Sequence, residues 1–295
     1  MQQALRDAAA AVRADAEARY PIVVDTTVWS MLDGRPMVGG SVLTSTQADA
    51  YQKALARFST DAPVVRPVVL TALDTVWQKQ RWAAVTGPLD MHRNADGEDL
   101  QTQWAPPAWV RWFAADPAGG PRALVQLPDG TVGWVHATNL RFDDPSTDPW
   151  GSIRRSQAGS AVAGSSLVDA ATLARARLGQ PYLWGGNTHA AADCSGFVQA
   201  IAWEAGGVLL PKNTKDQLRR GARVAADSIQ PGDFVYVTGR AKRVMHVGLA
   251  LASNDGLSVI HSCLSRERVL EESGEDFLRR YRFVGARRIV AWGTA

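Results

Sequence analysis

The stretch Asp193-Cys194-Ser195-Gly196-Phe197 is the most informative part of this chain, because an apolar run typical of a buried helix, residues 197–203, follows it directly. Cys194 is therefore expected in the first turn of a helix, behind an acidic cap. Unpaired backbone N–H groups and the positive end of the helix dipole stabilise a thiolate at such a position. Since a thiolate is the nucleophilic form of cysteine, the stretch predicts a cysteine hydrolase that alkylates at mildly acidic pH.

A thiol nucleophile requires a base, and the base requires a group that orients it. The chain has five histidines, and two of them lie in strand-like runs: His246 in residues 245–251 and His261 in residues 258–262. The turn Ser253-Asn254-Asp255-Gly256 between these runs predicts a β-hairpin. Because neighbouring antiparallel strands place side chains side by side, we predict His246 as the base and His261 as its orienter.

This order of helix-borne cysteine and strand-borne histidines resembles the NlpC-type peptidases, a papain-like family that cuts bacterial cell-wall peptides. The resemblance covers about residues 165–292. It rests on seven motifs in family order: Gly179-x-Pro181-Tyr182-x-Trp184-Gly185-Gly186, Asp193 to Phe197, Leu210-Pro211-Lys212-x-Thr214-x-x-Gln217, Gln230-Pro231-Gly232-Asp233, His246-Val247-Gly248, Ile260-His261-Ser262 and Gly285-Ala286-Arg287-Arg288. The implied reaction is acyl transfer from an amide to Cys194, with Tyr182 beside the nucleophile near the oxyanion.

The resemblance also implies substrate-binding residues. In some relatives the carboxylate that matches Asp193 binds the free ammonium of an N-terminal L-alanine, and the residue that matches Thr214 helps to frame the substrate. Ser195 and Trp184 complete the predicted binding site in this part of the chain. A helix cap alone is the alternative role for Asp193, and packing against Trp184 is the alternative for Tyr182.

Three further segments are expected before the peptidase domain, so the fold class is α+β with several domains. Residues 1–75 follow the order helix, strand, strand, helix, strand, which resembles a BON-like αββαβ module. Residues 76–142 hold six of the eleven tryptophans and resemble a small bacterial SH3-like barrel. Residues 143–166 are predicted to be a linker, and residues 167–295 the NlpC-type domain.

Within the SH3-like segment, the resemblance implies a carboxylate that joins the amine site, and Asp99 is the nearest match. Thr131 stands where the family often has a tyrosine that contacts the substrate's N-terminus. This departure leaves the requirement for a free L-alanine open.

The bulk composition excludes several classes of protein. A net charge of +3 without a basic tract does not indicate a nucleic-acid partner. Two cysteines form no disulfide framework, and no run is long enough to span a membrane. No signal-peptide core is present at the N-terminus, so a cytoplasmic location is expected unless a leader was removed. No cofactor or metal is expected, although a site made from Cys194, Cys263 and the histidines is conceivable.

The sequence therefore predicts a cysteine endopeptidase that cleaves the γ-D-glutamyl–diamino acid bond of peptidoglycan-derived peptides with a free N-terminal L-alanine, as in murein peptide recycling. Three alternatives stay open: a wall-remodelling endopeptidase that acts on intact peptidoglycan, an amidase or acyltransferase with the same Cys-His-His site, and an inactive wall-binding module. Neither the preferred diamino acid, lysine or meso-diaminopimelate, nor the oligomeric state follows from the sequence.

Overall fold

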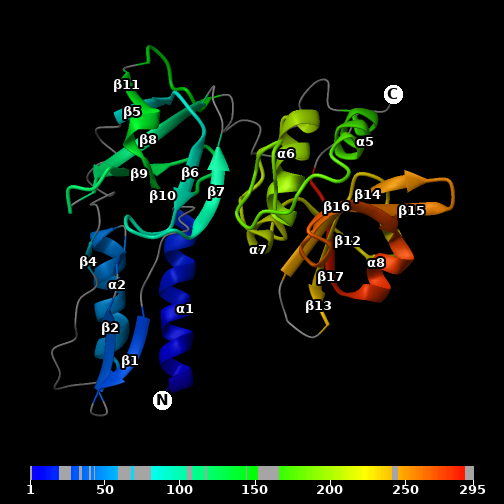
Figure 1. The fold of residues 1–295 in the computed structure, drawn as a ribbon. Helices are drawn as coiled ribbons and strands as arrows, with labels where there is room; N and C mark the ends of the chain where they lie inside the picture. The colour runs from blue at the N-terminus through cyan, green and yellow to red at the C-terminus, as the bar shows by residue number, and fades with distance from the viewer. Residues whose placement is uncertain are drawn as a thin grey trace. The chain divides into compact units, whose positions relative to one another are not determined.

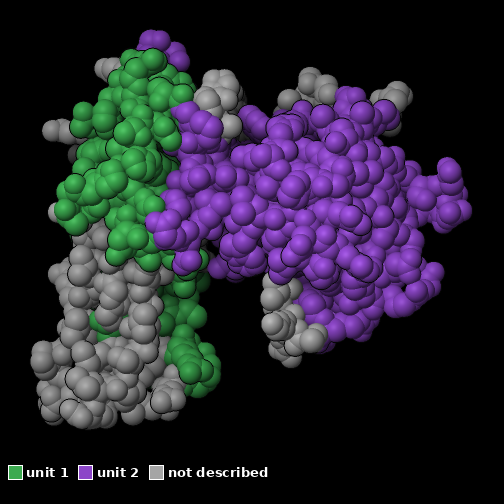
Figure 2. All heavy atoms as spheres, viewed as in Figure 1, with its two compact units in different colours: residues 1–86, 93–97, 107–144 green, residues 87–92, 98–106, 145–295 purple. Residues whose placement is uncertain are grey.

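The computed structural model describes residues 2–19, 28–32, 35–39, 41–42, 44–58, 68–69, 81–104, 108–116, 118–143, 145–151, 166–240 and 245–289. The chain divides into two compact units (Figure 2). The first unit comprises residues 1–86, 93–97 and 107–144, and the second comprises residues 87–92, 98–106 and 145–295. The predicted boundaries at residues 75, 142 and 166 stay predictions.

The first unit begins with two helices and short strands. Helix α1 (Gln2–Arg19) precedes the antiparallel hairpin of β1 (Val28–Leu32) and β2 (Arg35–Gly39). Helix α2 (Ser45–Ala56) connects the parallel strands β3 (Ser41–Val42) and β4 (Val68–Val69). Its first turn is capped by the Thr44 hydroxyl, which accepts a hydrogen bond from the Gln47 N–H at 3.0 Å. Buried side chains from β2, β3 and α2 form a small core with Ala9 and Val12 of α1.

The rest of the first unit is antiparallel β-structure. Its strands are β5 (Arg81–Val85), β8 (Ala108–Ala115), β9 (Arg122–Gln126), β10 (Val132–His136) and β11 (Leu140–Asp143), with the 3-10 helix η1 (Ala137–Asn139) before the last. They follow the order β11-β5-β8-β9-β10. Trp82 and Trp134 are buried among these strands, as expected of core tryptophans.

The second unit contains the antiparallel hairpin of β6 (Leu89–His92) and β7 (Leu100–Trp104), followed by helices. Helix α5 (Leu167–Ala176) starts at the Ser166 cap, and α6 (Cys194–Gly206) ends at Gly207 in the left-handed conformation, with φ of 60°. Figure 1 shows α5 and α6 packed side by side, with the short helix α7 (Thr214–Gln217) nearby.

An antiparallel sheet completes the second unit, in the order β12-β17-β13-β14-β15-β16. Its strands are β12 (Ala222–Val224), β13 (Phe234–Gly239), β14 (Met245–Ser253), β15 (Gly256–Cys263), β16 (Arg268–Ser273) and β17 (Tyr281–Arg288). The 3-10 helices η2 (Ala226–Ser228) and η3 (Leu264–Arg266) and the helix α8 (Gly274–Arg280) lie between them in sequence. The predicted hairpin of residues 245–262 is present as β14 and β15, joined at Asn254 and Asp255.

The two faces of this sheet carry different cores because side chains alternate along a strand. Val247, Leu249 and Ile260 pack with Phe197 and Ile201 of α6. The alternate positions on the same strands form a second cluster around Phe277 of α8; its other members are Val235, Val237, Ala250 and Val259. Two layers of structure therefore cover the sheet, as expected of an α+β domain.

Some predictions fall outside the described residues. These are the first part of the strand predicted over residues 20–32, most of the strand predicted over residues 64–73, Trp77, and residues 152–165 of the linker. The named SH3-like and BON-like modules stay predictions. No helix among the described residues is long and apolar enough to cross a membrane.

Candidate active site

Cys194 is the first residue of α6, as the sequence predicts. Asp193 caps this helix, and its Oδ1 atom accepts hydrogen bonds from the Gly196 N–H at 2.6 Å and the Ser195 hydroxyl at 2.9 Å. Gly196 can only be glycine here, because a Cβ atom would meet the backbone carbonyl of Gly186. The capping role of Asp193 is therefore present in the structure.

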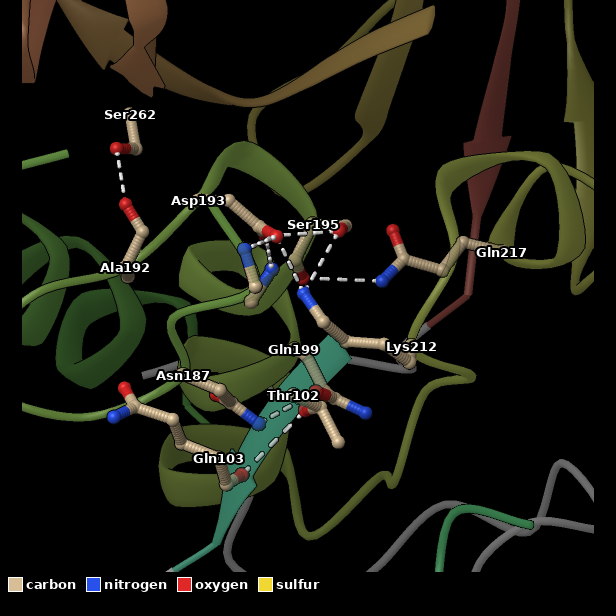
Figure 3. A network of polar contacts seen from close by, with 12 residues as sticks. Thr102, Gln103, Asn187, Ala192, Asp193, Ser195, Gln199, Lys212, Gln217 and Ser262 are labelled. Atoms are coloured by element: carbon tan, nitrogen blue, oxygen red, sulfur yellow. Dashed lines mark hydrogen bonds and ion pairs between the residues drawn. The ribbon is translucent and has the colours of Figure 1, made fainter. Parts of the chain in front are cut away.

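The second oxygen of Asp193 is also occupied, by a buried lysine (Figure 3). Lys212 Nζ lies 2.6 Å from Asp193 Oδ2 and 3.3 Å from Ser195 Oγ, and the Gly185 N–H donates to the same Oδ2 at 2.9 Å. Lys212 is only 4% exposed and Asp193 7%. Lys212 therefore contacts both sequence neighbours of Cys194, Asp193 and Ser195.

The surroundings of Cys194 favour the protonated thiol. Burial is the largest of the causes that raise its pKa to about 12, and the Asp193 carboxylate is the second. Lys212, the Val247 backbone and the Thr214 side chain lower it by smaller amounts. Burial therefore opposes the thiolate that the helix start favours. The resting thiolate stays a prediction.

The two predicted histidines are in direct contact on the face of the sheet that packs against Phe277. His246 Nε2 lies 2.8 Å from His261 Nδ1, and the rings meet edge to face at a centroid distance of 4.9 Å. Gly248 makes room for this pair, since a Cβ there would meet the Val259 side chain and lie 3.2 Å from the His261 Cβ. The glycine of the His-x-Gly motif is thus a steric requirement.

Both imidazoles are held neutral by burial. Desolvation lowers the pKa of His246 well below its ordinary value, and the neighbouring His261 lowers it further. Desolvation also lowers the pKa of His261, against an opposing effect from Glu272, whose Oε1 lies 2.9 Å from His261 Nε2. Within the described residues, Cys194 Sγ makes no hydrogen bond to the His246 ring. The thiol instead interacts with the backbone of Val247, the residue after His246.

Two aromatic residues of the loop before α6 were also predicted for the site. Tyr182 is half-buried, and burial is the main cause that raises the pKa of its phenol, with smaller effects from the nearby Cys194 and Asp193. Trp184 is 64% exposed and available for stacking on a ligand. Thr214, at the start of α7, is buried, and its side chain lowers the pKa of the Cys194 thiol.

Asp99 is exposed and lies in the second unit, immediately before β7. The carbonyl oxygen of its neighbour Leu100 would lie 2.6 Å from a Cβ on Gly185, so this hairpin approaches the loop that carries Trp184. No hydrogen bond within the described residues joins Asp99 to Asp193 or Cys194. Thr131 is buried in the first unit.

Cys263 is a second free, buried thiol. Its Sγ lies 3.3 Å from Ser265 Oγ and 3.6 Å from Tyr281 Oη, which fits the predicted role of a packed thiol. Among the residues that the structure describes, no group of three or more His, Cys, Asp or Glu side chains is arranged to hold a metal.

Two residues of the site, Lys212 and Glu272, were not predicted from the sequence. Lys212 lies in one of the seven family motifs, but a lysine is ordinarily a surface residue. Its pairing with Asp193 spans 19 positions of the sequence. Glu272 lies in a run of charged residues without any motif. One signal pointed to Lys212: a carboxylate such as Asp193 that is buried at a helix start needs a cation as its partner.

Comparison with known proteins identifies a family and several relatives. The sequence model of the NlpC/P60 family matches residues 179–288. A probable endopeptidase NlpC of Escherichia coli is 35% identical over 112 residues, which is 38% of this chain and 70% of that protein. A gamma-D-glutamyl-L-lysine dipeptidyl-peptidase of Bacillus subtilis is 39% identical over 88 residues, 29% of this chain but only 28% of that protein. A solved NlpC/P60 family structure from Bacillus cereus covers 90% of this chain and 79% of its own, with 18% identity and a TM-score of 0.38.

Proposed function

The chain belongs to the NlpC/P60 family and is a cysteine peptidase, and we propose that it cleaves the γ-D-glutamyl–diamino acid bond of peptides derived from peptidoglycan. The observation that carries the proposal is the position of Cys194 at the start of α6, which contacts the two strands, β14 and β15, that bear His246 and His261. The B. subtilis relative, a gamma-D-glutamyl-L-lysine dipeptidyl-peptidase, supports the choice of bond. A cytoplasmic location stays a prediction.

The reaction begins from a neutral thiol and a neutral imidazole. As Sγ of Cys194 attacks the γ-carbonyl carbon, Nδ1 of His246 takes the thiol proton, because Nε2 of the same ring is engaged with His261. The oxyanion is met by the N–H of Cys194, which has no acceptor within its own helix. The nearby Tyr182 hydroxyl is the second candidate donor.

The imidazolium of His246 then protonates the amine of the diamino acid, which leaves, and a thioester remains on Cys194. Water attacks the thioester carbonyl while His246 takes its proton. The peptide acid is released and the thiol is restored. The net reaction is hydrolysis of one amide bond, with no cofactor required.

The finer part of the proposal is recognition of a free N-terminal L-alanine. The ammonium needs a carboxylate with spare hydrogen-bonding capacity. Asp193 already accepts from four donors, one of them the Lys212 ammonium. Asp99 is exposed, next to the residue that abuts Gly185, and we propose it as the principal amine-binding carboxylate.

The test is mass spectrometry of the protein with L-Ala-γ-D-Glu-meso-diaminopimelate, with its lysine counterpart, with both peptides N-acetylated, and with intact sacculi. Release of L-Ala-γ-D-Glu from the free peptides, abolished in Cys194→Ala, is the expected result. Release from sacculi as well would make the protein a wall-remodelling endopeptidase. Cleavage of none of these would overturn the proposed substrate and leave an amide or thioester of another class.

A further inference from the structure

Beyond the predicted Cys-His-His site, the structure contains a fourth polar residue in line. His246 Nε2 meets His261 Nδ1 at 2.8 Å, and His261 Nε2 meets Glu272 Oε1 at 2.9 Å. We propose that Glu272 is a positioning residue: its carboxylate selects the tautomers of His261 and His246 and thereby leaves Nδ1 of His246 as the proton acceptor for Cys194. This inference rests on the roles proposed above for Cys194 and His246.

The strand register explains why Glu272 reaches His261. Residue pairs opposite each other on antiparallel strands point to the same face, and β15 pairs with β16 as Val259↔Glu272 and His261↔Leu270. Glu272 therefore lies on the His261 face, diagonally across from it. Glu271, its neighbour, points to the opposite face, where it bonds to Arg175 and Ser258.

The protons of Glu272, His261 and His246 can be placed in one way only. A carboxylate can only accept, so Nε2 of His261 carries its proton and donates to Glu272. A neutral His261 then has its lone pair on Nδ1, which accepts from His246 Nε2–H. A neutral His246 consequently has its lone pair on Nδ1, the atom that must receive the thiol proton. The lowered pKa values of both rings mean that they are neutral before substrate binds.

Without Glu272 the arrangement can reverse. A His261 protonated on Nδ1 would donate to His246 Nε2 and move the His246 proton to Nδ1. That tautomer holds a proton at the atom where the base must be, so it cannot deprotonate Cys194. The role of Glu272 is thus to exclude an inactive tautomer, as a buried acidic orienter does in other hydrolases.

The surrounding side chains hold Glu272 in place and keep water from replacing its carboxylate as the acceptor for His261. Arg280 forms an ion pair with its second oxygen at 2.9 Å. Phe277 and Tyr281 pack on the His246 ring at centroid distances of 6.1 and 5.0 Å, and Phe277 packs on His261 at 5.0 Å. His261 is fully buried, so the carboxylate is the one acceptor within reach of its Nε2 among the described residues.

The experiment combines NMR of the histidine ring nitrogens with kinetics on the full chain. Two-bond ¹H–¹⁵N correlation spectra assign the tautomer of each ring directly. In the unmodified protein we expect His261 protonated on Nε2 and His246 protonated on Nε2. Finding His261 protonated on Nδ1 would overturn the proposal without any variant.

Three variants separate positioning from a structural role. Glu272→Leu should let His261 take the other tautomer and lower kcat by about 10²-fold, with KM within twofold. Glu272→Gln retains a carbonyl acceptor and should keep both tautomers and most of kcat, even if thermal stability falls beside Arg280. Glu271→Gln, the matched control on the other face, should leave tautomers and kcat unchanged.

The readouts distinguish failure of this inference from failure of the proposed function. If no peptide is cleaved but the tautomers are as stated, the substrate proposal fails and the arrangement stands; the rate of Cys194 alkylation by iodoacetamide then replaces kcat. If Glu272→Leu folds and keeps its tautomers and its rate, Glu272 has no positioning role. If Glu272→Leu does not fold, a tautomer change or large kcat loss in Glu272→Gln overturns the inference, and their retention supports it.

Discussion

Lys212 Nζ lies 2.6 Å from Oδ2 of Asp193, and both side chains are buried against the first turn of the helix that carries Cys194. The pairing changes how Asp193 should be understood. A carboxylate with a buried ammonium on one oxygen and the helix N–H on the other is a structural element of the site. It holds the loop at Gly185 to the start of α6 and places a positive charge near the thiol.

Removing Lys212 should therefore destabilise the protein. We expect Lys212→Met to lower the free energy of unfolding by about 3–5 kcal/mol, because it leaves Asp193 buried without a cation. The measurement is urea unfolding followed by tryptophan fluorescence. Lys215→Met, an exposed lysine three residues away, is the control and should change the stability by less than about 0.5 kcal/mol.

The double variant Asp193→Asn/Lys212→Met tests the cause. Asparagine still caps a helix, and neither residue is then charged, so most of the lost stability should return. A double variant as unstable as Lys212→Met alone would show that lost packing of the lysine stem, not the unpaired carboxylate, is responsible.

Selectivity for a free amine should depend on Asp99 more than on Asp193, the cap of α6. We expect Asp99→Asn to reduce the preference for the free peptide over its N-acetylated form by about tenfold, the loss of one exposed charge pair of roughly 1.4 kcal/mol. The measurement is the ratio of kcat/KM for the two peptides. Glu98→Gln, the adjacent exposed carboxylate, is the matched control; an unchanged ratio in Asp99→Asn would reject this role.

Alkylation of Cys194 should be slow at neutral pH and rise steadily with pH. Because burial raises the thiol pKa to about 12, the thiolate fraction increases tenfold for each pH unit below that value. The rate with iodoacetamide, followed at the Cys194 peptide by mass spectrometry, should climb from pH 6 to pH 9 without a plateau. A rate that is already constant at pH 6 would mean a resting thiolate–imidazolium pair.

The same assay has an internal test of charge. The Asp193 carboxylate raises the pKa of Cys194 and the Lys212 ammonium lowers it. At pH 8, Asp193→Asn should therefore speed alkylation and Lys212→Met should slow it. Equal effects of the two variants would point to a general loosening of the site.

Gly248 should be required for activity more than for folding. In Gly248→Ala the new methyl group meets the Val259 side chain and the Cβ of His261, so the His261 ring must move away from His246. We expect kcat to fall by about 10²-fold and the unfolding free energy by roughly 1–3 kcal/mol from overpacking. The measurements are peptide turnover and thermal unfolding.

The control for this substitution is Gly285→Ala on β17. There the added Cβ makes an ordinary contact of 3.4 Å with Leu218, and activity should persist. A Gly248→Ala protein with full activity would show that the His246–His261 contact is dispensable.

The local sequence predicted the parts of this protein that depend on neighbours in the chain. Helix α6 starts at Cys194 behind its Asp193 cap, and β14 and β15 form a hairpin, because capping and turn formation are decided within a few residues. The seven motifs identified the family for the same reason, since they are short runs of sequence.

What the tertiary structure alone decided are the partners and charges of these residues. Lys212 reaches Asp193 across 19 positions, and Glu272 reaches His261 through the pairing of β15 with β16. The raised pKa of the Cys194 thiol follows from its burial, which depends on the elements packed around α6. Short-range rules act along the chain, whereas desolvation and ion pairing act through space, and only the folded protein brings those groups together.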